Sequence, residues 1–347
     1  APSEHDTSIM TEPKGHMGSP HYHNESSQLR SRLLALLSIL LLTTSSTPSG
    51  AINPETICFA GSGKPKTDIV MCTMALLQAP PLSRATLLTR RARARIQIED
   101  DARALEDLAQ SLAINPLSAE ALTERGRALG FLGRPAGARE ALNKALRLSP
   151  NDSRARRIRG VLALTLGEYA GAIMDLSRVI AAGSGERESY ALRGIAHYFA
   201  QDQAASLRDF REATARDSSY AYLPLWIALA QQRVGQISEA GLQQARAALL
   251  GDQDWPAPVI ALFQTPGPEA LAAALNLAAR GTPQLRRARS GQVHFLYGEL
   301  LRSRDKPEMA RDAFAAAVRE GDPRTVEYAL ATQRLAGQHT RGKRGKN

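Results

Sequence analysis

The sequence predicts an all-α protein built as a solenoid of paired helices. Two columns of side chains repeat every 34 residues. The small column is Gly126, Gly160 and Gly194, and the large apolar column is Leu108, Leu142, Leu176 and Phe210. Helix axes approach to about 8–10 Å, and small contact residues permit the shorter distances. We therefore expect the glycines where two helices touch and the large side chains between one pair and the next.

Turn residues predict where each helix of a pair ends. The first helix ends at a glycine in three copies, Gly133, Gly167 and Gly235, while Gln201 takes that place in another. Glycine suits the position because the residue after a helix often adopts a left-handed conformation. Pro116 and Pro150 follow the second helix, which proline cannot continue.

These residues resemble the tetratricopeptide repeat, a hairpin of two helices that stacks into a right-handed superhelix. The clearest copy starts at Ala119 and carries Leu122, Gly126, Leu129, Ala138, Leu142, Ala145 and Pro150 at the family's preferred positions. Arg125 departs from the pattern, since the family prefers leucine there. Further copies start at Ala85, Ser153, Arg187 and Ala221. We therefore assign residues 85–254 to the repeats.

Residues 1–51 are expected to be a disordered N-terminus followed by a secretory signal peptide. The first 28 residues are polar and show no apolar period. Arg30 and Arg32 then precede the apolar run Leu33–Thr44, which is shorter than the roughly 18 residues of a membrane span. Ser49-Gly50-Ala51 supplies small residues for cleavage after Ala51. The alternatives are an uncleaved membrane anchor or a buried helix.

The capping segment 52–84 contains the two cysteines of the chain, Cys58 and Cys72. In an oxidising compartment two nearby thiols usually pair, so we expect a disulfide that ties the start of this segment to the helix Thr67–Gln78. That helix resembles the second half of a repeat. The alternative is two unpaired buried thiols.

The repeat register breaks after Asp252. Residues 255–338 are expected to form helix pairs, with one more repeat-like pair from Gly291 and a capping helix Thr325–Leu335, before a basic tail at 339–347. The pattern of this half is similar to the end of the new-lipoprotein-I type of bacterial envelope adaptor. The resemblance implies an adaptor role, although the lipidation cysteine of that type is missing.

The family resemblance also implies a binding surface, because the first helices of such a stack line an inner groove. The positions that line it hold Thr89, Arg93, Arg127, Phe131, Arg154, Arg157, Tyr198 and Phe199. Arginines with aromatic neighbours suit an acidic or C-terminal peptide, through charge-assisted hydrogen bonds and stacking. The lysine and asparagine of the family's carboxylate clamp are absent from these positions. The alternative is that the arginines form only a solvated face.

Other chemistry finds little support in the sequence. Gly61-Ser62-Gly63-Lys64 is not a phosphate-binding loop, since Cys58 and Pro65 occupy two places that the motif reserves for other residues. No ligand spacing predicts a metal, and no motif predicts a cofactor or catalysis. A net charge of +10 raises the possibility of nucleic acid, but an exported protein meets acidic proteins and anionic lipids instead. The sequence therefore predicts a non-enzymatic scaffold for protein partners in the bacterial periplasm, with a cytosolic or membrane-tethered adaptor second and an enzyme third.

Overall fold

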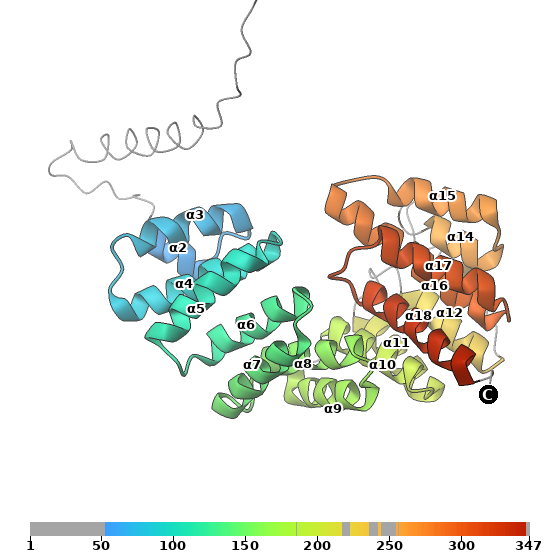
Figure 1. The fold of residues 1–347 in the computed structure, drawn as a ribbon, viewed down its shortest axis with the longest axis horizontal. Helices are drawn as coiled ribbons and strands as arrows, with labels where there is room; N and C mark the ends of the chain where they lie inside the picture. The colour runs from blue at the N-terminus through green and yellow to red at the C-terminus, as the bar shows by residue number, and fades with distance from the viewer. Residues whose placement is uncertain are drawn as a thin grey trace, which may run out of the picture. The chain divides into compact units, whose positions relative to one another are not determined.

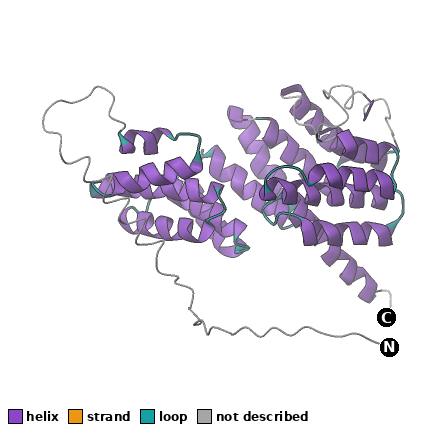
Figure 2. Ribbon diagram, turned by 90° about the horizontal axis from the view of Figure 1, so that it is seen from above, coloured by secondary structure: helices purple, strands orange, loops and turns teal. Residues whose placement is uncertain are grey.

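Every element that the structure describes is a helix (Figures 1 and 2). The computed structural model describes residues 53–344 apart from 185, 217–222, 236–241, 244–254 and 256. The first part contains α2 (Pro54–Ala60), α3 (Pro65–Leu76), α4 (Pro81–Gln97), α5 (Asp101–Ile114), α6 (Ala119–Phe131), α7 (Pro135–Leu148), α8 (Ser153–Thr165) and α9 (Tyr169–Val179). The short π-turn η1 (Ile180–Ser184) separates it from α10 (Arg187–Phe199), α11 (Gln203–Arg216), α12 (Leu223–Arg233), α14 (Ala257–Gln264), α15 (Pro268–Ala278), α16 (Pro283–Ser303), α17 (Pro307–Glu320) and α18 (Val326–Arg344).

Consecutive helices pair as the 34-residue register predicts. The pairs α4–α5, α6–α7, α8–α9 and α10–α11 begin close to the starts of the four copies from Ala85 to Arg187, and α16–α17 is the later repeat-like pair. The all-α stack of helix pairs is therefore confirmed. Helix α18 runs to Arg344, nine residues beyond the end expected at Leu335. The signal segment and the expected cleavage point lie outside the described residues.

The glycine column lies against the large apolar column inside each pair. A Cβ added to Gly126 would lie 2.5 Å from Leu142 Cγ, and one added to Gly194 would lie 2.7 Å from Phe210 Cδ1. Leu142 and Phe210 are fully buried. The large side chain therefore packs on the glycine of its own hairpin, sixteen residues earlier, and not only between neighbouring pairs as the sequence suggested.

The turn between the two helices of a pair adopts the left-handed conformation whether or not the residue is glycine. Gly133 has a φ of 66°, and Gln201 has the same φ at the equivalent place. Glu99, 34 residues before Gly133, has a φ of 65°. The pair geometry therefore imposes this conformation, and glycine only makes it less costly.

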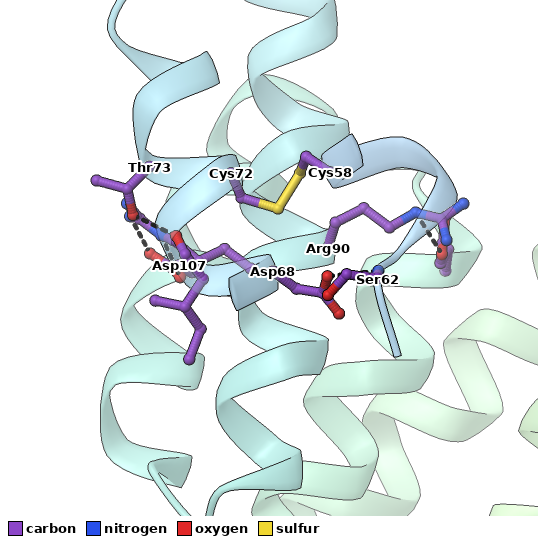
Figure 3. Close-up of a disulfide and its surroundings, with 10 residues drawn as sticks. Cys58, Ser62, Asp68, Cys72, Thr73, Arg90 and Asp107 are labelled. Carbon is purple, nitrogen blue, oxygen red and sulfur yellow. Dashed lines mark hydrogen bonds and ion pairs between the residues drawn. A yellow bond between two sulfur atoms is a disulfide. The ribbon is translucent and has the colours of Figure 1, made fainter. Parts of the chain in front are cut away.

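The expected disulfide joins Cys58 to Cys72, with a Cα–Cα distance of 4.9 Å (Figure 3). It links α2 to α3, the two helices of the capping segment. Both cysteines are buried beside Leu87 and Leu88 of α4. The bond thus fixes the short helix α2 to α3, and the two cysteines pack against the first helix of the first repeat.

The apolar core of the described residues is divided into separate clusters. A large aromatic-rich cluster runs from Ala163 in α8 to Ala331 in α18 and contains Trp226 and Phe295. Smaller clusters lie before it, the last of them ending at Ala155 in α8. Helix α8 is therefore where the two parts of the core meet. None of the helices described here is both long and apolar enough to cross a membrane.

Candidate partner-binding surface

Three predicted groove arginines converge on one buried carboxylate, that of Glu124 on α6. Arg93 Nε of α4 lies 2.8 Å from Glu124 Oε1, and Arg154 Nη2 of α8 lies 2.5 Å from the same oxygen. Arg127 Nη1, one turn along α6, lies 3.5 Å from Oε2. The first helices of three successive pairs therefore meet at this point, because the superhelix brings equivalent helix faces together.

The cluster around Glu124 carries more positive than negative charge. Glu124 is fully buried, and its Oε2 has no hydrogen-bond partner. Glu120 adds a second carboxylate, 2.5 Å from Arg93 Nη2. Burial lowers the pKa of Arg127 and of Arg154, and Glu124 opposes that shift. Arginine nevertheless stays protonated in proteins, so three guanidinium groups face two carboxylates here.

Aromatic and charged neighbours border this cluster. The Arg127 guanidinium lies 5.8 Å from the centre of the Phe131 ring, and the Arg324 guanidinium lies 3.9 Å from it. Arg157 forms ion pairs with Glu186 and Glu188 at the N-terminal end of α10. Arg93, Arg127, Phe131 and Arg154 thus lie together across α4, α6 and α8, and Arg157 lies one helical turn beyond Arg154 on α8; we call these five residues the arginine surface.

The other three predicted groove residues are buried in contacts within the chain. Thr89 Oγ1 lies 2.9 Å from Ser111 Oγ, between α4 and α5. Tyr198 is fully buried and donates to Glu299 Oε2 at 2.8 Å. Phe199 stacks on Tyr169 and lies under Arg334 of α18. The repeat register could not reveal this for Tyr198 and Phe199, because the covering helices α16 and α18 come from far along the sequence.

Glu299 forms a second cluster with arginines from three helices. Arg334 Nε lies 2.6 Å from Glu299 Oε1, and Arg233 Nη2 lies 3.1 Å from Oε2. Arg302 is the third arginine, at 3.8 Å from Oε1. Burial pushes the pKa of Glu299 upward, but Arg334 and the other arginines outweigh it and hold that pKa below its ordinary value. Burial also raises the pKa of Tyr198 well above its usual value. Both oxygens of Glu299 are therefore satisfied by protein groups.

A ladder of bidentate ion pairs was missed in the sequence, although its signal is there. Three arginines at the position where the family prefers leucine each bind an aspartate sixteen residues later: Arg91 with Asp107, Arg159 with Asp175, and Arg193 with Asp209. Each also donates to the preceding helix, at Thr73, Asn143 or Ser177. The fourth arginine of the column, Arg125, has Ala141 sixteen residues later and is exposed. An arginine–aspartate search at this spacing would have found the ladder.

His294, which is buried, and His197, which is partly buried, both contact carboxylates of the chain. His294 Nε2 lies 3.2 Å from Glu320 Oε2, and burial lowers the pKa of His294. Burial also lowers the pKa of His197, which lies near Asp209. Within the described ranges, no group of three potential ligand side chains could hold a metal ion. The arginine surface is therefore the candidate site that the geometry favours.

A family model described as tetratricopeptide repeat matches residues 91–163, which span α4 to α8. Within that range the chain is similar to the tetratricopeptide repeat family. The similarity of the C-terminal half to the new-lipoprotein-I type stays a prediction, since the tetratricopeptide match does not reach that half. A comparison with curated proteins finds no match.

Several solved structures resemble parts of this chain in fold. A tetratricopeptide repeat protein from Parabacteroides merdae is 16% identical, with a TM-score of 0.49, and the match covers 82% of this chain and 98% of that one. MamA from Desulfovibrio magneticus is 21% identical, with a TM-score of 0.44, and the match covers 47% of this chain and 94% of that one. PilF from Pseudomonas aeruginosa is 14% identical, with a TM-score of 0.44, and the match covers 73% of this chain and 98% of that one.

Proposed function

We propose that the chain is a scaffold that holds a protein partner through an acidic segment bound on the arginine surface. The observation that carries the proposal is the cluster around Glu124, where three arginines face only two carboxylates, so that guanidinium N–H donors outnumber the acceptors beside them. A carboxylate from a partner would complete the hydrogen bonding of guanidinium groups that are already desolvated. Hydrogen bonds of this charge-assisted kind are roughly twice as strong as neutral ones.

The location that we propose is the bacterial envelope, after export. Two features support it: the signal-like layout of residues 30–51, and the disulfide between Cys58 and Cys72, because such bonds persist in oxidising compartments. N-terminal sequencing of the protein from its native host tests export. A mature end near Ile52 supports it, and a chain that keeps Leu33–Thr44 favours the second candidate, a membrane-tethered adaptor with an uncleaved apolar segment.

The binding test compares two charge-matched double variants. Arg127→Glu with Arg157→Glu reverses two charges of the arginine surface, while Arg125→Glu with Arg211→Glu reverses two exposed charges outside it. The probe is a fluorescent peptide with several aspartates and glutamates, read by anisotropy. We expect the first variant to weaken binding about tenfold or more, since each lost hydrogen bond to a charged group contributes about 1.5–3 kcal/mol.

Circular dichroism shows whether each variant keeps its helices. Equal binding by wild-type protein and the Arg127→Glu, Arg157→Glu variant would place the partner elsewhere. Equal weakening by both double variants would show only a general effect of net charge. The proposal includes no reaction, and an enzyme remains the third alternative, which would need substrate turnover by the purified chain.

A further inference from the structure

The turn between α17 and α18 contacts the first repeat across more than two hundred residues of sequence. Arg324 Nη2 donates to the carbonyl oxygen of Ile96 at 2.8 Å and lies 3.5 Å from Asp101 Oδ1. Its guanidinium also lies on the Phe131 ring. Beside it, Glu99 accepts a hydrogen bond from Gln284 at 2.5 Å. We call these contacts the latch.

The latch is polar and is not backed by shared apolar core. The large apolar cluster lies wholly after α8 begins, between Ala163 and Ala331, and the smaller clusters end at Ala155. No cluster of the described residues includes side chains from both sides of the latch. Apolar burial thus stabilises each part separately, and α8 is the helix that both parts use.

The hydrogen bonding of the latch is also incomplete. Arg324 Nη1 and Asp101 Oδ1 are buried without a hydrogen-bond partner. A buried polar atom that lacks a partner carries a desolvation cost that solvent would remove. The closed contact is therefore weaker than its number of charged groups suggests, and opening it would let water satisfy both atoms.

The latch covers part of the arginine surface. Arg324 lies 3.9 Å from the centre of the Phe131 ring, on which Arg127 also lies at 5.8 Å. A partner segment that stacks on Phe131 must therefore displace Arg324. We propose that the two parts of the molecule hinge at α8, and that release of Arg324 from Ile96, Asp101 and Phe131 opens the arginine surface to its partner.

This inference rests on the proposed function, but its test uses no partner, so the two can fail separately. The full chain carrying Arg324→Ala is compared with wild type and with Arg319→Ala, which removes an exposed arginine paired only with the adjacent Glu320. Phenylglyoxal, which reacts with guanidinium groups, is the probe. Mass spectrometry follows its rate of reaction at Arg127, with the exposed Arg125 of the same helix as internal reference.

We expect Arg324→Ala to raise the rate at Arg127 by at least about fivefold relative to Arg125, because a minor open state gains population when the closed contact is lost. Small-angle scattering should show a larger radius of gyration, while Arg319→Ala matches wild type in both readouts. An unchanged rate and radius in a variant with normal circular dichroism would overturn the proposal. If Arg324→Ala does not fold, Glu99→Ala, which removes the neighbouring latch contact, is judged by the same criteria.

Discussion

Two clusters in this molecule have the same composition and different surroundings. Glu124 and Glu299 are both fully buried, and each has three arginines around it. Tyr198, itself fully buried, completes the hydrogen bonding of Glu299, whereas Oε2 of Glu124 has no hydrogen-bond partner. Arg334 of α18 pairs directly with Glu299, whereas Arg324 borders the Glu124 cluster at Phe131 and forms no ion pair with Glu124 among the described residues. The same side chains thus stabilise the core in one place and leave unused binding capacity in the other.

The largest effect is expected at Glu299. Glu299→Gln keeps the shape of the side chain but removes the charge that neutralises Arg334 and Arg233. Loss of one partner from a buried ion-pair cluster typically costs about 3–5 kcal/mol, and we expect about 3 kcal/mol because an amide oxygen still accepts from Tyr198. Urea unfolding measures it. A loss below about 1 kcal/mol would mean that the cluster contributes little to the core.

Lowering the pH should remove the charge of Glu299 reversibly, by protonating its carboxylate. The pKa of Glu299 lies below its ordinary value in the folded chain, so its contribution to the free energy of unfolding is present above about pH 4.5 and is lost as pH falls through the folded pKa. Stability at pH 7 and at pH 3 should therefore differ less in Glu299→Gln than in wild type. Parallel pH profiles for the two proteins would contradict this.

Removal of the Glu124 carboxylate should lower the free energy of unfolding by less than removal of the Glu299 carboxylate. Glu124→Gln is expected to lower the free energy of unfolding by about 1–2 kcal/mol, since Glu124 is only partly hydrogen-bonded and Arg154 retains solvent contact. The same change removes one negative charge from the arginine surface, so it should tighten binding of the acidic peptide. Equal destabilisation by Glu124→Gln and Glu299→Gln would contradict the claim that the Glu124 cluster contributes less to stability.

A single hydroxyl accounts for part of the difference between the clusters. Tyr198→Phe removes the donor to Glu299 Oε2 while it keeps the buried ring, and we expect a loss of about 1 kcal/mol. Tyr190→Phe is the control, because its hydroxyl accepts only from Arg216 at an exposed site. Thermal unfolding should separate the two variants, and equal melting temperatures would mean that the Tyr198 hydroxyl is unimportant.

The smallest effect is expected in the pair α6–α7, which lacks the arginine–aspartate ion pair of the ladder. Ala141→Asp would give Arg125 the aspartate that Arg91, Arg159 and Arg193 already have, and we expect a gain of up to about 1 kcal/mol. With Arg125→Ala added, the new buried carboxylate has no partner and the gain should become a loss. Destabilisation by Ala141→Asp without the second change would show that the α6–α7 pair does not accept the ladder geometry.

The paired helices could be predicted because their causes are local or periodic. Gly126 and Leu142 share one hairpin, and the turn at Gly133 or Gln201 recurs at a fixed interval. The disulfide followed from two cysteines close in sequence. Of the eight predicted groove residues, the five on the arginine surface lie together, while Thr89, Tyr198 and Phe199 are buried by other parts of the chain.

The sequence by itself determined the helix pairs, their period and the side chains that each first helix carries, because these depend on residues within one or two repeats. Only the tertiary structure decided which arginines from different helix pairs meet at Glu124 or Glu299 and which aromatic rings are covered. Glu299 meets Tyr198 from 101 residues away, and Arg324 meets Ile96 from 228 residues away. Such contacts depend on the small rotation between successive pairs summed over the whole stack, which no single repeat specifies.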